Sequence, residues 1–190
     1  MKKMIGLSCV ILCGGQSKRM GQDKALLEFD KQGTLSHYQY SKLKACFDTC
    51  YLSAKTNKFD FDAKIILDNF DDYSPLLALK NILETTKKPT FIICVDTPFV
   101  SLDTICKLYE NLGNLDAIIA KAKRTHYLCG IYSPKILPFI SKNLKLNNHA
   151  IRKSLELASV KYQDFANEEE FMNVNTKEEY KKSLEVLEKK

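Results

Sequence analysis

The sequence predicts an α/β fold with a mainly parallel sheet, and three observations indicate this class. Continuous apolar, β-branched runs recur along the chain, as in strands that are covered on both faces. Segments with the helical spacing of apolar residues lie between these runs, and such alternation is typical of parallel sheets with right-handed crossovers. Several helix starts also carry capping residues. Because the sequence contains no internal repeat or linker, we expect residues 1–190 to form a single domain.

Six apolar runs are the predicted strands. The first, residues 8–13, follows lysines in a pattern that superficially resembles a signal peptide. This run is short and leads into a glycine loop instead of a cleavage site, so we interpret it as the first core strand of a cytoplasmic protein. No apolar segment reaches the roughly 18 residues of a spanning helix, so we expect no membrane contact. The other predicted strands are residues 49–54, 64–67, 90–95, 116–121 and 161–165.

Helical spacing of apolar residues predicts helices over residues 34–47, 75–86, 102–112 and 134–143. Two of these helices begin with a serine followed by a proline, Ser74 before the second and Ser133 before the fourth. A capping hydroxyl before a proline at the first helical position is a typical helix start. Thr176 and Glu179 have the spacing of a capping box, which predicts a last helix through Leu187.

The composition is that of a globular protein, with 45% hydrophobic and 27% charged residues. The formal net charge of +6, from 29 Lys and Arg against 23 Asp and Glu, suits an anionic ligand but equally suits plain solubility. The lysines are dispersed, without interleaved aromatic residues or a nucleic-acid-binding motif. We therefore expect no nucleic-acid partner.

The seven cysteines are an odd number and show no C-x-x-C spacing. Four of them lie in apolar runs, where a free cysteine behaves as a small hydrophobic residue: Cys9, Cys13, Cys94 and Cys129. Cys46 and Cys50 could share a helix face as half of a metal site, but no matching pair completes it. The pattern favours reduced structural thiols, as in cytosolic proteins.

The segment "LCGGQSKRMGQDKALL", residues 12–27, concentrates glycine and positive charge directly after the first strand. A loop there opens at the carboxyl edge of a parallel sheet, where ligands usually bind. Gly14 and Gly15 allow close approach of a ligand, and successive amide groups can form a nest for phosphate oxygens. Arg19 can hold oxygens through its fork and Lys24 can act as a point charge. Neither the Walker pattern nor the dinucleotide fingerprint fits, and a glycine-containing surface turn with solvated charges is the alternative interpretation of this segment.

The order G-G-x-S-x-R-M-G-x-D-K resembles the signature of the nucleotidyltransferases that act on the molybdenum cofactor, and within them the molybdenum cofactor guanylyltransferases. The likeness extends through further motifs over nearly the whole chain. It implies a Rossmann-like three-layer αβα nucleotidyltransferase fold and catalytic roles for Arg19 and Lys24. The nucleotide contacts that it implies in this segment are Leu12, Cys13, Gly14, Gly15 and Lys24.

The segment "FIICVDTPFVSLD" places Asp96 just past a buried strand. A carboxylate at that edge can hold Mg²⁺ beside a triphosphate, although an aspartate before Pro98 can also simply cap a turn. The resemblance assigns Asp96 the metal, nucleotide-binding and catalytic roles, with Val95 in place of the family's usual cysteine.

The segment "IILDNFDDYSPLLAL" resembles the family's element for the guanine nucleotide, with Asp68 as the matching aspartate. A carboxylate suits guanine because N1–H and N2–H₂ are adjacent donors. Ser74 and residues 77–79 depart from the glycines that the family shows around Pro75. An acidic, solvated loop is the alternative interpretation of this segment.

Two further segments match the family less completely. In "YLSAKTN", Lys55 or Asn57 takes the place of an Asn-Ala-Asn-like nucleotide contact, and the spacing does not choose between them. "FMNVNTKEEY" matches the family's Asn-Val-Asn-Thr-x-Glu-Glu, which implies that Asn173 and Asn175 face the pterin-bearing substrate. His126 aligns with a family His-Pro element but receives no role.

The resemblance implies Mg²⁺-dependent transfer of GMP from GTP to the phosphate of molybdopterin or the molybdenum cofactor, with release of pyrophosphate. A terminal phosphate needs little help from a general base, which agrees with the absence of a Ser-His-Asp or Cys-His arrangement. We expect a monomer whose further partners are molybdoenzyme chaperones. The alternatives are a cytidylyltransferase, another nucleotidyltransferase of this fold, or a non-catalytic nucleotide- or cofactor-binding module.

Overall fold

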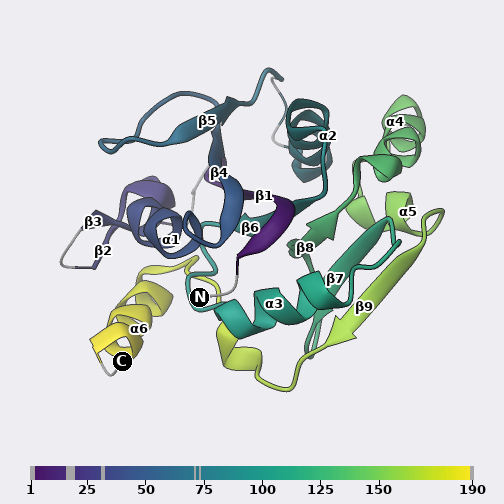
Figure 1. Ribbon diagram of the computed structural model, residues 1–190. Helices are drawn as coiled ribbons and strands as arrows, with labels where there is room; N and C mark the ends of the chain where they lie inside the picture. Colours follow the sequence, from purple (N-terminus) through teal and green to yellow (C-terminus); the bar gives the residue numbers. More distant parts are fainter. Residues whose placement is uncertain (1–2, 16–19, 31–32, 71, 73, 189–190) are drawn as a thin grey trace.

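The computed structural model describes residues 3–15, 20–30, 33–70, 72 and 74–188. Its centre is a seven-stranded sheet in the order β5-β4-β1-β6-β8-β7-β9 (Figure 1). Neighbouring strands are parallel except at β8, which runs antiparallel to both β6 and β7. The strands are β1 (Met4–Leu12), β4 (Phe47–Ala54), β5 (Lys64–Leu67), β6 (Thr90–Cys94), β7 (Ala117–Lys121), β8 (Thr125–Tyr132) and β9 (Val160–Asp164). Two short strands, β2 (Glu28–Asp30) and β3 (Gly33–Thr34), form a separate antiparallel pair.

Helices cover both faces of the sheet, so the predicted three-layer α/β architecture with a mainly parallel sheet is confirmed (Figure 1). One face is covered by α1 (Leu35–Leu43), α3 (Leu102–Glu110) and α6 (Lys177–Glu188). The other face is covered by α2 (Pro75–Thr86), α4 (Leu137–Lys145) and α5 (Ile151–Leu155). Short 3₁₀ segments complete the fold: η1 (Lys24–Leu26), η2 (Pro134–Ile136) and η3 (Glu168–Phe171).

The apolar runs are continuous because both faces of each central strand are buried. In β1, Cys9 and Ile11 pack with the residues of α1 and α3, whereas Val10 packs on the opposite face with α2. In β6, Phe91 and Ile93 take the first face and Ile92 the second. Successive side chains of a strand point to opposite faces, so a strand between two helical layers needs an apolar residue at every position.

The predicted helix starts are present. The Ser74 hydroxyl accepts from the backbone N–H of Leu77 at 3.4 Å and caps α2 ahead of its first-turn proline. Thr176 and Glu179 form the reciprocal capping box: the Thr176 hydroxyl accepts from Glu179 N at 3.2 Å, and Glu179 Oε2 accepts from Thr176 N at 3.0 Å. The box fixes the start of α6 next to the segment that enters the candidate site.

Two sequence predictions were wrong in detail. The helix predicted over residues 34–47 ends at Leu43, and the chain turns so that Phe47 already begins β4. The strand β8 was not predicted, because its first half is only half-buried and Gly130 interrupts its pattern. That glycine is required by close packing, since a Cβ there would lie 2.6 Å from the carbonyl oxygen of Ile118 in β7.

The hypothesis of a cysteine pair on a helix face is also wrong. Cys46 lies in the turn before β4, and Cys50 lies within β4. All seven cysteines are free thiols, and burial raises the pKa of Cys9, Cys13 and Cys94. Thiols with raised pKa values are poor nucleophiles and metal ligands, which agrees with a purely structural role. None of the described helices has the length and apolar character needed to cross a membrane.

Candidate active site

The glycine loop leaves β1 at the carboxyl edge of the sheet, between the ends of β4 and β6. Its start is fixed by two backbone hydrogen bonds, from Cys13 N to Ser53 O at 2.8 Å and from Val95 N to Leu12 O at 3.0 Å. Gly15 has a φ of +142°, a conformation that other residues rarely adopt. Residues 16–19 lie outside the described part of the chain, so the prediction for Arg19 falls outside it as well.

Lys58 holds the two ends of this loop together. Its Nζ donates to the carbonyl of Cys13 at 3.0 Å and forms an ion pair with the carboxylate of Asp23. Asp23 Oδ1 in turn accepts from Ala25 N at 3.0 Å and caps η1, which begins at Lys24. Sequence reasoning missed Lys58, although it lies immediately after the segment in which Lys55 and Asn57 were considered.

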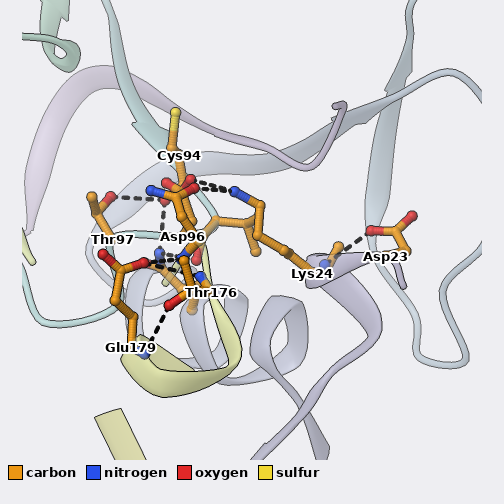
Figure 2. Close-up of polar contacts among 11 residues, drawn as sticks. Asp23, Lys24, Cys94, Asp96, Thr97, Thr176 and Glu179 are labelled. Atoms are coloured by element: carbon orange, nitrogen blue, oxygen red, sulfur yellow. Dashed lines mark hydrogen bonds and ion pairs between the residues drawn. The ribbon is translucent and has the colours of Figure 1, made fainter. Parts of the chain in front are cut away.

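Lys24, Asp96 and Asn175 meet at the start of η1, and we call them the Lys24 cluster. Figure 2 shows Lys24 and Asp96 of this cluster. Lys24 Nζ donates to Asp96 Oδ2 at 2.7 Å and to Asn175 Oδ1 at 2.6 Å. The side chains of Lys24 and Asp96 are only 18% and 16% exposed, so their attraction is weakly screened. The backbone of Val174 adds a hydrogen bond from its N–H to the carbonyl of Asp96 at 2.8 Å. Three predicted site residues from distant segments are thus brought together.

Two side chains of α1 fix the backbone on either side of Asp96. Gln39 is fully buried and Lys42 follows one helical turn later, so both face the same loop. Each donates to two backbone carbonyls: Gln39 to Cys94 at 2.9 Å and Val95 at 3.1 Å, and Lys42 to Pro98 at 2.6 Å and Val100 at 3.1 Å. Sequence reasoning missed both residues, because nothing in a helical pattern shows which loop its polar positions will meet.

An open pocket of about 560 Å³, solvent space included, is lined by Gly14 and Gly15. It is called here the base pocket, because the resemblance assigns its Asp68 to the guanine base. Its polar lining residues are Lys55, Asp68, Asp72 and Ser74, and its apolar ones include Leu12, Phe70, Pro75, Ala78 and Leu128. Of the predicted nucleotide contacts, Leu12, Gly14, Gly15 and Asp68 line it, whereas the side chain of Cys13 is buried in the core.

Asp68 is held at the edge of the base pocket. The fully buried Ser53 hydroxyl donates to Asp68 Oδ1 at 2.8 Å. The second oxygen, Oδ2, would lie only 3.2 Å from a Cβ at Gly14, so a glycine there leaves room beside the carboxylate. Burial raises the pKa of Asp68, while the Ser53 hydrogen bond and the nearby Lys55 and Lys58 oppose that rise.

The structure separates residues that the sequence left as alternatives. Lys55 lines the base pocket, whereas Asn57 accepts from Phe59 N at 3.3 Å in an exposed turn. Where the family shows glycines, Ser74 caps α2 and also lies 2.8 Å from His149 Nδ1, and Leu79 packs into the core. Ser74 and Ala78, which stand at departing positions, themselves line the base pocket.

The segment that brings Asn175 to Lys24 is supported by aromatic stacking. His126 stacks on Phe171 with ring centroids 4.4 Å apart, just ahead of Asn173, which is half-buried. Burial, reinforced by Arg124, lowers the pKa of His126. Within the described residues, its Nε2 is buried and has no hydrogen-bond partner. The neutral imidazole therefore acts as a packing surface for this segment.

The chemistry of Asp96 fits a magnesium ion that is shared with a substrate. The described residues contain no group of three or more metal-ligating side chains. Mg²⁺ commonly binds one or two carboxylates together with substrate phosphates and water, so a single carboxylate beside a phosphate loop suits it. The site does not resemble a closed, all-protein metal cage.

Comparison with known proteins identifies the family of this chain. Residues 9–163 match the model of the MobA-like NTP transferase domain. A molybdenum cofactor guanylyltransferase of Campylobacter jejuni subsp. doylei is 39% identical over 93% of this chain and 94% of its own length. Another molybdenum cofactor guanylyltransferase, from Helicobacter pylori, is 31% identical over 95% of this chain and 90% of its own length. The crystal structure of molybdopterin-guanine dinucleotide biosynthesis protein A from Archaeoglobus fulgidus superposes on this chain with a TM-score of 0.83. The match covers 96% of this chain and all of that one at 19% sequence identity, so it supports the fold.

Proposed function

Because the chain belongs to the MobA-like NTP transferase family, and is thus a nucleotidyltransferase, we propose that it transfers GMP from GTP to the phosphate of molybdopterin or of the molybdenum cofactor. The observation that carries the proposal is the Lys24 cluster, in which Lys24 contacts Asp96 and Asn175, together with the base pocket lined by Gly14 and Gly15. The curated relatives named above are guanylyltransferases and match almost the full chain.

Each part of the site has a place in this reaction. The base enters the pocket at Asp68, and the loop amides and Lys24 bind the phosphates. Arg19 adds a further cationic contact. Asn173 and Asn175 hold the pterin-bearing substrate, whose phosphate oxygen attacks the α-phosphorus of GTP. A new P–O bond forms to that phosphorus, the bond to the bridging oxygen breaks, and pyrophosphate leaves.

The protein stabilises charge in this step and needs no nucleophile of its own. The attacking phosphate is already largely ionised, so the cationic groups serve mainly to align it and to stabilise the leaving group. Mg²⁺ held by Asp96 and the nucleotide would add positive charge to the phosphates. Lys24 is held by Asp96 and Asn175, so it is already oriented toward the reacting groups.

The test is pyrophosphate release from purified protein supplied with molybdopterin and either GTP or CTP, with and without Mg²⁺. We expect release with GTP and Mg²⁺ and its loss in Lys24→Ala. Preference for CTP would identify a cytidylyltransferase instead. Binding of GTP without any pyrophosphate release, under conditions in which a known guanylyltransferase is active, would identify a binding module.

A further inference from the structure

The strand register places a lysine beside the predicted guanine-binding aspartate. β4 lies between β5 and β1, and its last residues pair with theirs: Ala54 with Leu67, and Ser53 with Leu12. The residues that follow these strands therefore emerge side by side. Lys55 emerges next to Asp68 on one side and next to the glycine loop on the other. Both Lys55 and Asp68 line the base pocket, and Lys55 is close enough to lower the pKa of Asp68.

The electrostatics of the pocket favour a base over a phosphate as the partner of Lys55. Asp68 and Asp72 also line it, and two carboxylates disfavour an anion. The apolar side chains of Phe70, Pro75 and Leu128 suit a flat ring. In the proposed function the phosphates bind at the loop amides and Lys24 instead.

Guanine offers complementary groups to a carboxylate and an ammonium together. N1–H and N2–H₂ are donors, whereas O6 and N7 are acceptors that lysine commonly contacts. Adenine has the N6–H₂ donor where guanine has O6, and an acceptor at N1. Adenine would therefore oppose a donor to the ammonium and an acceptor to the carboxylate, and a site built on hydrogen bonds rejects such a mismatch strongly.

We propose that Lys55 determines base specificity together with Asp68: its ammonium donates to O6 and N7 of guanine, while the Asp68 carboxylate accepts from N1–H and N2–H₂. The inference rests on the proposed function, because it concerns the base of the nucleotide that is transferred. It assigns Lys55 the half of the base edge that Asp68 cannot bind, since a carboxylate has no proton to donate.

The test compares Lys55→Met with the wild type in calorimetric titrations against GTP, ITP, ATP and GMP. Methionine keeps the length and apolar stem of lysine but removes the ammonium. We expect GTP and ITP affinity to fall by the same factor, on the order of 10- to 100-fold, because ITP keeps O6 and N7. The affinity for GMP should fall by the same factor as the affinity for GTP. The ratio of GTP affinity to ATP affinity should become smaller than in the wild type.

Two results would overturn this inference. Unchanged GTP affinity in Lys55→Met would show that the ammonium does not contact the base. Equal losses for GTP and ATP with GMP unaffected would place Lys55 on the phosphates. Lys64→Met removes the same charge from an exposed position at the start of β5 and should bind like the wild type. If the wild type itself fails to prefer GTP, the proposed function fails first, and independently of Lys55.

Discussion

The Lys24 cluster and the base pocket flank the same glycine loop but are built on opposite principles. In the cluster, charged and amide groups from three distant segments bond directly to one another at 2.6–2.7 Å. In the base pocket, polar residues share the lining with apolar side chains, and Asp68 is held by a serine hydroxyl. Departures from the family pattern at Lys55, Ser74 and residues 77–79 fall in or beside the pocket. All three cluster residues match the pattern, and the departure beside them is Val95, next to Asp96. The reaction class can therefore be read from the signature, but the base preference must be read from this chain's own side chains.

The largest expected effect is a fall in kcat when Asp96 is replaced, and it should not occur when Asp68 is replaced. Asp96→Asn removes the charge that orients Lys24 and is proposed to hold Mg²⁺, so kcat should fall on the order of 100- to 1000-fold. Asp68→Asn should instead raise the KM for GTP with little change in kcat, because it alters binding that is the same in the ground and transition states. Steady-state pyrophosphate release with varied GTP checks both.

This contrast has a clear contrary result. If Asp68→Asn lowered kcat as much as Asp96→Asn, the base pocket would take part in the chemical step and the division between the two regions would be wrong. Thermal melts of both variants serve as the control for folding.

A smaller effect is expected from the residue that fixes the Asp96 loop. Gln39→Met removes two hydrogen bonds and leaves the buried carbonyl of Val95 without that donor, which should lower the free energy of unfolding by roughly 1–3 kcal/mol. Displacement of Asp96 should lower kcat by about tenfold, while GTP affinity stays unchanged. Chemical denaturation and steady-state kinetics measure the two effects.

Asn111→Ala is the matched control, because Asn111 also donates its amide to a carbonyl, at 2.9 Å, but on an exposed helix end. It should change neither stability nor rate appreciably. A Gln39→Met variant that lost GTP affinity but kept its rate would show that α1 supports the base pocket instead of the Lys24 cluster.

The sequence predicted the parallel core well because burial on both faces leaves an unmistakable apolar run, as in β1 and β6. It missed β8, whose Gly130 is explained only by the approach of Ile118 in a neighbouring strand. In the site, the signature residues Lys24 and Asp96 were identified from motifs. Gln39 and Lys58 were not, because their hydrogen bonds to backbone carbonyls depend on tertiary placement that local spacing cannot show.

A pH effect should distinguish the base pocket from the cluster. Asp68 must be ionised to accept from both donors of guanine, and burial raises its pKa. As the pH is lowered, GTP affinity should therefore begin to decline at a higher pH than it would if Asp68 were an exposed aspartate. Ser53→Ala removes a hydrogen bond that stabilises the charged form, so the decline should move to still higher pH. Calorimetric GTP titrations across pH measure the shift.

Ser133→Ala is the control: it removes a serine hydroxyl that caps η2, away from Asp68, and should leave that pH profile unchanged. An unshifted profile in Ser53→Ala would mean that the ionisation of Asp68 does not govern GTP binding.

The smallest expected effect concerns stability near the segment that carries Asn173 and Asn175. The folded state lowers the pKa of His126 below its ordinary value of 6.5, so between these two values the unfolded chain takes up a proton that the folded chain does not. The free energy of unfolding should therefore decline as the pH falls below 6.5. His126→Phe keeps the stacking on Phe171 and removes the titrating group, so unfolding measured by denaturant across this range should depend less on pH. GTP affinity should stay the same, because the stacked pair supports the segment that brings Asn175 to Lys24. A loss of GTP affinity would mean that the two regions are mechanically coupled through β8, whose Leu128 lines the base pocket.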